Sequence, residues 1–93
     1  MQDRLLAYLE HVPFATELAA WAQIESGSDD AEGLAQFAAL LSERFHQLGA
    51  TVAPVGDTHL LARWPGVGKP VLILGHFDTV YPRGTLASQP VAF

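Results

Sequence analysis

The ten residues from 71 to 80, VLILGHFDTV, constrain the fold of this chain more than any other segment. The first four are apolar, which predicts a buried strand. The strand leads directly into His76 and Asp78, and side chains two residues apart on an extended segment point to the same side. We therefore expect the Asp78 carboxylate to hold one imidazole nitrogen of His76, leaving the other nitrogen available to a metal ion.

A His and an Asp at this spacing are a weak signal alone, because a surface pair after a strand explains them equally well. Their context favours a site. The pair follows the carboxyl end of the most apolar predicted strand, where ligands bind in open α/β sheets. Residues 81–84, YPRG, form a turn-rich segment that could wall a pocket. One His and one Asp still provide too few donors for a complete metal centre.

The other candidate residues have simpler explanations. His11, His46 and His59 are expected to be surface or partly buried side chains rather than metal ligands. Glu25 and Ser26 lie in a loop rich in Ser, Gly and Asp. They either shape the rim of a pocket or belong to a loop that caps two helices.

Apolar periodicity predicts helices in the first half of the chain and strands in the second. The expected helices are one capped by Asp3, one starting at Pro13, and one capped by Asp29 or Asp30 that ends at Gly49 in a left-handed turn. The expected strands cover residues 51–55, 59–64 and 71–75, with the last one central. Helices followed by strands indicate an α/β fold, with helices packed on a mixed β-sheet.

The composition argues against several classes of function. At 93 residues the chain is one domain or part of one, and its net charge of −5 with five scattered Lys and Arg residues disfavours nucleic-acid binding. The absence of cysteine excludes disulfides and thiolate metal sites. Without a signal-peptide pattern or a membrane-length apolar run, we expect a cytoplasmic protein that does not enter membranes. Hydrophobic residues make up 49% of the chain and charged residues 16%, so we expect apolar surface that meets more protein.

Three segments resemble the M20 family of zinc exopeptidases. Residues 75–86, GHFDTVYPRGTL, are similar to its first metal-site motif, His-x-Asp-x-Val, in the form found in the glutamate carboxypeptidase branch. Residues 24–33 resemble the helix–loop–helix junction of that branch, and residues 47–52 resemble its helix end and first strand. Order and spacing agree over roughly residues 5–93.

The resemblance implies a site with two zinc ions. His76 would be a ligand of one ion, and Asp78 would orient His76 and raise its basicity. Residues 79–86 would form part of the pocket wall. Residues 1–93 would be the N-terminal portion of a catalytic domain, because the bridging Asp, the general-base Glu, the other ligands and the lid or dimerisation domain lie further along in the family.

The resemblance also implies the activity of the complete protein. It would hydrolyse an amide bond next to a C-terminal residue, with glutamate as one candidate, in peptide or acyl-amino-acid substrates. A catalytic zinc usually needs three protein ligands and a water. We therefore expect the 93-residue chain to bind zinc weakly at most and to be inactive.

Two alternatives remain open. One is a non-catalytic structural or partner-binding fragment, whose apolar sheet pairs with a second chain or self-associates through an exposed strand edge. The other is a desuccinylase or deacylase of the same superfamily, which shares the chemistry and differs in the substrate pocket.

Overall fold

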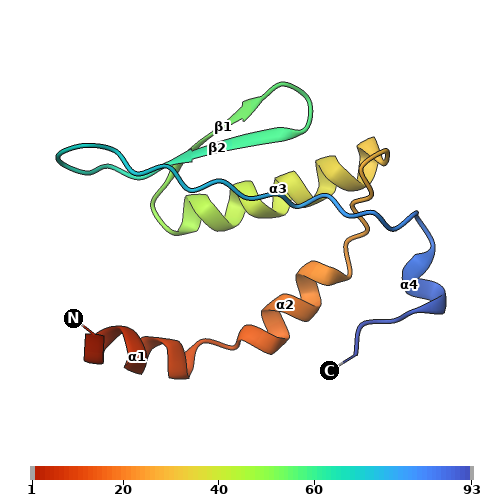
Figure 1. Cartoon of the computed structure of the whole chain (residues 1–93), viewed down its shortest axis with the longest axis horizontal. Coiled ribbons are helices and arrows are strands. Elements are labelled where there is room, and N and C mark those ends of the chain that lie inside the picture. The colour runs from red at the N-terminus through yellow and green to blue at the C-terminus, as the bar shows by residue number, and fades with distance from the viewer. Residues whose placement is uncertain (1, 93) are drawn as a thin grey trace.

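The computed structural model describes residues 2–92, and the first half of this range forms three helices in succession (Figure 1). These are α1 (Gln2–His11), α2 (Phe14–Ala22) and α3 (Ala31–Gln47). Pro13, the predicted first residue of the second helix, takes the N-cap position of α2, and the helix itself begins one residue later at Phe14. Asp3 lies inside the first turn of α1, so the predicted cap at this residue is wrong.

Both ends of α3 follow from local sequence. The Asp30 carboxylate accepts a hydrogen bond from the Gly33 N–H at 2.9 Å, which caps the first turn as predicted. At the other end Gly49 has φ 93°, and its N–H donates to the His46 carbonyl at 3.0 Å. The Ala50 N–H donates to the Phe45 carbonyl at 3.0 Å. These two bonds form a Schellman motif, which turns the chain into the next strand.

The strands β1 (Thr51–Val55) and β2 (His59–Arg63) form an antiparallel hairpin with Thr51 opposite Arg63. Trp64 fastens the hairpin to α3. Its ring meets Phe45 edge to face at 5.5 Å, and its Nε1–H donates to the Leu48 carbonyl at 3.0 Å. The hairpin therefore covers the C-terminal half of α3.

The third predicted strand, residues 71–75, does not form in the described part of the chain. The segment runs as irregular extended backbone past α3 (Figure 1). Its side chains from Val71 to Leu74 are between 73% and 89% exposed. A strand needs backbone partners on a neighbouring strand, and within residues 2–92 only Thr79 finds one, in an isolated parallel bridge with Gly27. The sheet is therefore two-stranded and antiparallel, and the α/β class holds without the expected mixed sheet.

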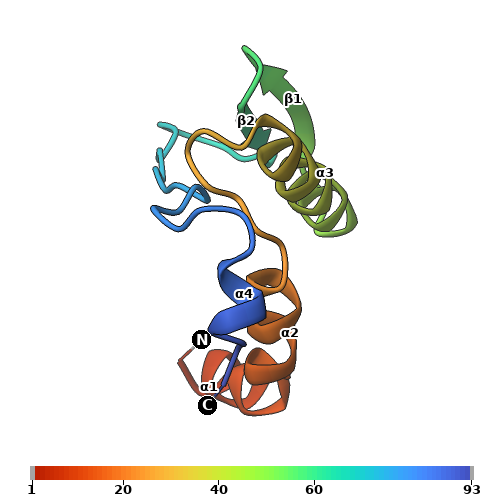
Figure 2. The ribbon, with the colours of Figure 1, turned by 90° about the vertical axis from the view of Figure 1, so that its right-hand side faces the viewer.

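A short helix, α4 (Thr85–Ser88), follows the extended segment on the same side of α3 as α2 (Figures 1 and 2). Packing between the helices relies on a few contacts. Trp21 of α2 meets Phe37 of α3 edge to face at 6.1 Å, and Arg44 of α3 pairs with Glu17 of α2 at 2.8 Å. None of the helices described here is long and apolar enough to cross a membrane.

Candidate functional site

The loop between α2 and α3 lies directly against the segment that carries His76 and Asp78. The Ser28 N–H donates to the Thr79 carbonyl at 3.0 Å, and the Thr79 N–H donates to the Ser26 carbonyl at 2.8 Å. The Ser26 side chain is 1% exposed, and its hydroxyl donates to the Phe77 carbonyl at 2.6 Å. Gly27 permits this approach, since a Cβ there would lie 2.8 Å from the Tyr81 carbonyl oxygen. The loop thus fixes the backbone of residues 77–79.

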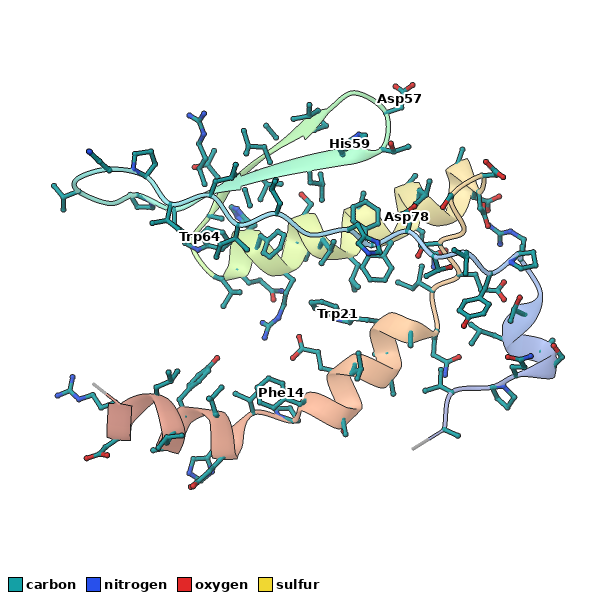
Figure 3. The ribbon with its side chains drawn as sticks, in the orientation of Figure 1. Phe14, Trp21, Asp57, His59, Trp64 and Asp78 are labelled. Carbon is teal, nitrogen blue, oxygen red and sulfur yellow. The ribbon has the colours of Figure 1, made fainter. Side chains whose placement is uncertain are left out.

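Phe77 anchors the segment from its other side. Its ring stacks on Phe37 of α3 with centroids 5.4 Å apart and planes 5° apart. In extended backbone the neighbours of Phe77 point the opposite way, and the Nδ1 atom of His76 lies 3.1 Å from Asp78 Oδ1. The predicted contact between His76 and Asp78 is therefore present, and Figure 3 shows Asp78 where the segment crosses α3.

The acceptors around His76 define its protonation pattern. Nδ1 faces the Asp78 carboxylate and also the Asp78 carbonyl oxygen at 3.1 Å. Both groups only accept hydrogen bonds, so in the neutral ring Nδ1 carries the hydrogen and Nε2 keeps its lone pair. The His76 side chain is 83% exposed, which leaves Nε2 accessible. An imidazole held in this way is suited to bind a metal ion.

A serine on the loop holds the other side of the Asp78 carboxylate. The Ser28 hydroxyl donates to Asp78 Oδ2 at 2.7 Å. This bond, followed by the contact with His76, lowers the pKa of Asp78 below its ordinary value of 3.8, although partial burial opposes the shift. The carboxylate is therefore ionised at neutral pH and accepts hydrogen bonds at both oxygens. The prediction of the site did not include Ser28, whose only signal was its place in the Ser-Gly-Ser loop.

A second set of contacts ties residues 83–86 to the same loop. The Glu25 carboxylate accepts the N–H groups of Gly84 and Leu86 at 2.9 and 3.0 Å, and these two bonds lower the pKa of Glu25. Arg83 pairs with Asp30 at 2.7 Å, which lowers the pKa of Asp30 and raises that of Arg83. Glu25 therefore caps the start of α4 from a distant part of the chain, and it also lines a cavity beside this loop, in agreement with the predicted pocket rim.

A cavity of about 580 Å³ opens beside the pair, between α2, the loop and α4. Most of its lining is apolar and includes Trp21, Phe37, Tyr81 and Leu86, with His76 and Asp78 also bordering it. Trp21 points from α2 toward α3 (Figure 3). Several residues of the predicted pocket wall, 79–86, line this cavity, while their role toward a substrate stays a prediction.

The residues present do not complete a metal centre. Within residues 2–92, no group of three or more His, Asp or Glu side chains could hold a metal ion together. His11, His46 and His59 are exposed, and Figure 3 shows His59 near Asp57 at the turn of the hairpin. The chain therefore offers one candidate ligand, His76, with its orienting carboxylate, and no catalytic step through a metal follows from these residues alone.

Comparison with known proteins finds a similar sequence within a carboxypeptidase. The chain is 39% identical over 75 residues to carboxypeptidase G2 from Pseudomonas sp. (strain RS-16), a match that covers 72% of this chain and 18% of that relative. The chain thus spans less than a fifth of the length of the curated relative that it matches. No protein-family model matches the chain, and no solved structure matches it. These findings support a distant relation between this chain and part of an M20 peptidase.

Proposed function

We propose that this chain is the N-terminal portion of the catalytic domain of a zinc-dependent M20 carboxypeptidase. The observation that carries the proposal is the pairing of His76 Nδ1 with Asp78, which leaves Nε2 exposed. The 39% identity to carboxypeptidase G2 supports it. The complete protein would hydrolyse an amide bond next to a C-terminal residue of a peptide or acyl-amino acid, with glutamate as the first candidate.

In this proposal the chain supplies one corner of a two-zinc site. Bound zinc would polarise the scissile carbonyl and lower the pKa of a water molecule. His76 would offer the Nε2 lone pair as a ligand. Asp78 would hold the Nδ1 hydrogen, keep the ring oriented and make the imidazole more basic. The general base and the remaining ligands belong to the rest of the protein, so hydrolysis is not assigned to this chain alone.

A chimera tests the proposal. Residues of this chain replace the matching 75-residue stretch of carboxypeptidase G2, and zinc content and hydrolysis of an acyl-glutamate are measured. We expect a folded chimera that binds zinc and hydrolyses the substrate. His76→Ala should remove the activity and reduce the zinc content, whereas His59→Ala, an exposed histidine on β2, should change neither. A folded chimera without zinc or activity would contradict the proposal, as would full activity in His76→Ala.

The isolated chain provides the complementary measurement. We expect no hydrolysis of the acyl-glutamate by the purified 93-residue protein, because three protein ligands are usual for a catalytic zinc and this chain offers one. Turnover that disappears in His76→Ala would show that the chain is an enzyme by itself.

A second candidate function rests on the exposed segment from Val71 to Leu74. We propose that this segment pairs with another strand, and in the isolated chain the nearest source of such a strand is a second copy. Its backbone pairs with no strand among residues 2–92, and its side chains are apolar. These are the features that strand addition uses. This role is compatible with the first, because the same segment would pair with the remainder of a longer protein.

A further inference from the structure

We propose that Ser28 is a positioning residue for His76. Its hydroxyl fixes the Asp78 carboxylate, and the carboxylate fixes which imidazole nitrogen faces outward. The use of this arrangement for zinc rests on the proposed function above. The arrangement itself rests on contacts between side chains of this chain.

The two oxygens of Asp78 have different partners. Oδ2 accepts from the Ser28 hydroxyl at 2.7 Å, and Oδ1 faces His76 Nδ1 at 3.1 Å. Rotation of the carboxylate would break at least one of these bonds. The bond to Ser28 therefore limits the carboxylate orientations that His76 can meet, and the bond to His76 limits those that Ser28 can meet. The Ser28 hydroxyl has a second acceptor, the Thr79 carbonyl, at 3.2 Å. Its single hydrogen favours the shorter bond to the charged carboxylate.

Ser28 is itself held in place by the backbone. Its N–H donates to the Thr79 carbonyl, and Gly27 forms a parallel bridge with Thr79. The hydroxyl therefore projects from a backbone position already fixed relative to Asp78. In contrast, the His76 and Asp78 side chains are 83% and 44% exposed, so packing alone does not hold them.

Removal of the hydroxyl should consequently release the pair. Without a partner for Oδ2, the Asp78 carboxylate can rotate into solvent and its bond to Nδ1 becomes intermittent. The neutral His76 ring then exchanges between its two tautomers, and the Nε2 lone pair is available for only part of the time.

Ser26 provides a matched control on the same loop. It also donates a hydroxyl hydrogen bond across to the segment, to the Phe77 carbonyl, but the structure gives it no bond to Asp78. Ser26→Ala should lower stability, because the partly buried Phe77 carbonyl loses its donor, while the tautomer of His76 stays as in the wild type. Ser28→Thr keeps the hydroxyl, at a position that is exposed.

The test is ¹⁵N NMR of the neutral His76 ring in the full chain, recorded in mildly alkaline solution. We expect the Nδ1–H tautomer to dominate in the wild type, Ser28→Thr and Ser26→Ala. Ser28→Ala should give a mixture close to that of Asp78→Ala. A wild-type tautomer in Ser28→Ala would overturn the inference, and so would an equal change in Ser28→Ala and Ser26→Ala.

Zinc affinity in the carboxypeptidase chimera separates this inference from the proposed function. We expect Ser28→Ala to weaken zinc binding about tenfold, at the lower end of the 10- to 100-fold cost of losing groups that orient a metal ligand, because Ser28 acts on His76 through Asp78. If the tautomer changes in the isolated chain but the folded chimera binds no zinc, the positioning role stands and the proposed function fails. If zinc binding requires His76 but Ser28→Ala alters neither tautomer nor affinity, the positioning role fails alone.

Discussion

At the residue scale, Gly33 shows how closely the loop before α3 approaches the helix. A Cβ at this position would overlap the Glu25 carbonyl oxygen and lie 3.0 Å from Asp30 Cγ. Both neighbours take part in the contacts that hold residues 83–86. The absence of a side chain at Gly33 thus lets α3 begin where Glu25 and Asp30 can hold these residues.

We predict that Gly33→Ala destabilises the fold by about 1–3 kcal/mol, the usual cost of forcing atoms into an occupied space. The helix propensity of alanine would recover up to about 1 kcal/mol, but a backbone oxygen cannot move aside as a flexible side chain can. Urea unfolding followed by circular dichroism measures the effect. Gly66→Ala, where a Cβ meets nothing within 4 Å, is the control and should be close to neutral. Equal effects of the two substitutions would refute this explanation.

Glu25 should make the stability of the fold depend on pH. Hydrogen bonds from Gly84 and Leu86 lower its pKa below the ordinary value of 4.5 in the folded state. In acid the unfolded chain therefore binds more protons than the folded chain. The contribution of Glu25 to the free energy of unfolding is complete above the pKa that Glu25 has in the unfolded chain, and it is lost as the pH falls through the pKa of Glu25 in the folded chain. Glu25→Gln should reduce stability at neutral pH and also reduce the loss between about pH 5 and pH 3. Urea unfolding across this range should give a shallower slope for the variant, and an unchanged slope would exclude Glu25 as a source.

At the scale of elements, α3 contacts α2 and both strands of the hairpin, and Asp30 has two functions at its start. Its carboxylate caps the Gly33 N–H and pairs with Arg83. We predict that Asp30→Ala lowers the free energy of unfolding by about 0.5–2 kcal/mol, mainly through loss of the cap, because Arg83 is half-exposed and solvent weakens its ion pair with Asp30. Asp29→Ala removes an adjacent exposed carboxylate and should cost less. Thermal unfolding measures the stability of the two variants. A larger loss of stability in Asp29→Ala would show that Asp29, and not Asp30, caps the helix.

The elements that could be predicted from sequence are those whose causes are local. The cap of α3, predicted at Asp29 or Asp30, its end near Gly49 and the two strands that follow depend on caps, turns and periodicity within a few residues. The strand expected at 71–75 depends on a neighbouring strand, which residues 2–92 do not supply. A short apolar run such as residues 71–75 becomes a buried strand only where neighbouring elements cover it.

The same distinction applies to the candidate site. The contact of His76 with Asp78 could be predicted, because a spacing of two residues places both side chains on one side of extended backbone. The Ser28 bond to Asp78 joins residues 50 positions apart, and the Glu25 bond to Gly84 joins residues 59 positions apart. These partners depend on how the loop folds against the segment, which no local pattern specifies.

At the scale of the whole molecule, the described chain is more open than a compact domain. Its radius of gyration is 15.6 Å, against about 12 Å expected for a compact chain of this length. Among the described residues, the buried hydrophobic side chains are Leu34 and Ala50. An open groove of about 1460 Å³ lies between the hairpin, α3 and residues 66–78, and apolar side chains such as Leu41, Leu60 and Leu72 line it. A chain of this shape exposes apolar surface. A further strand, or a further layer of secondary structure, could cover that surface.

The last prediction concerns what covers this surface when the 93-residue chain is alone. Exposed apolar side chains on unpaired extended backbone favour pairing with another chain, so we predict concentration-dependent self-association in sedimentation velocity. Ile73→Lys places a charge in the middle of the segment, at a side chain that is 89% exposed, and should shift the protein toward monomer without loss of helical circular dichroism. Val67→Lys adds the same charge at an equally open position outside the segment and should leave association nearly unchanged. A monomeric wild type at high concentration would contradict the prediction, and equal effects of the two lysines would show that net charge, rather than the segment from Val71 to Leu74, controls association.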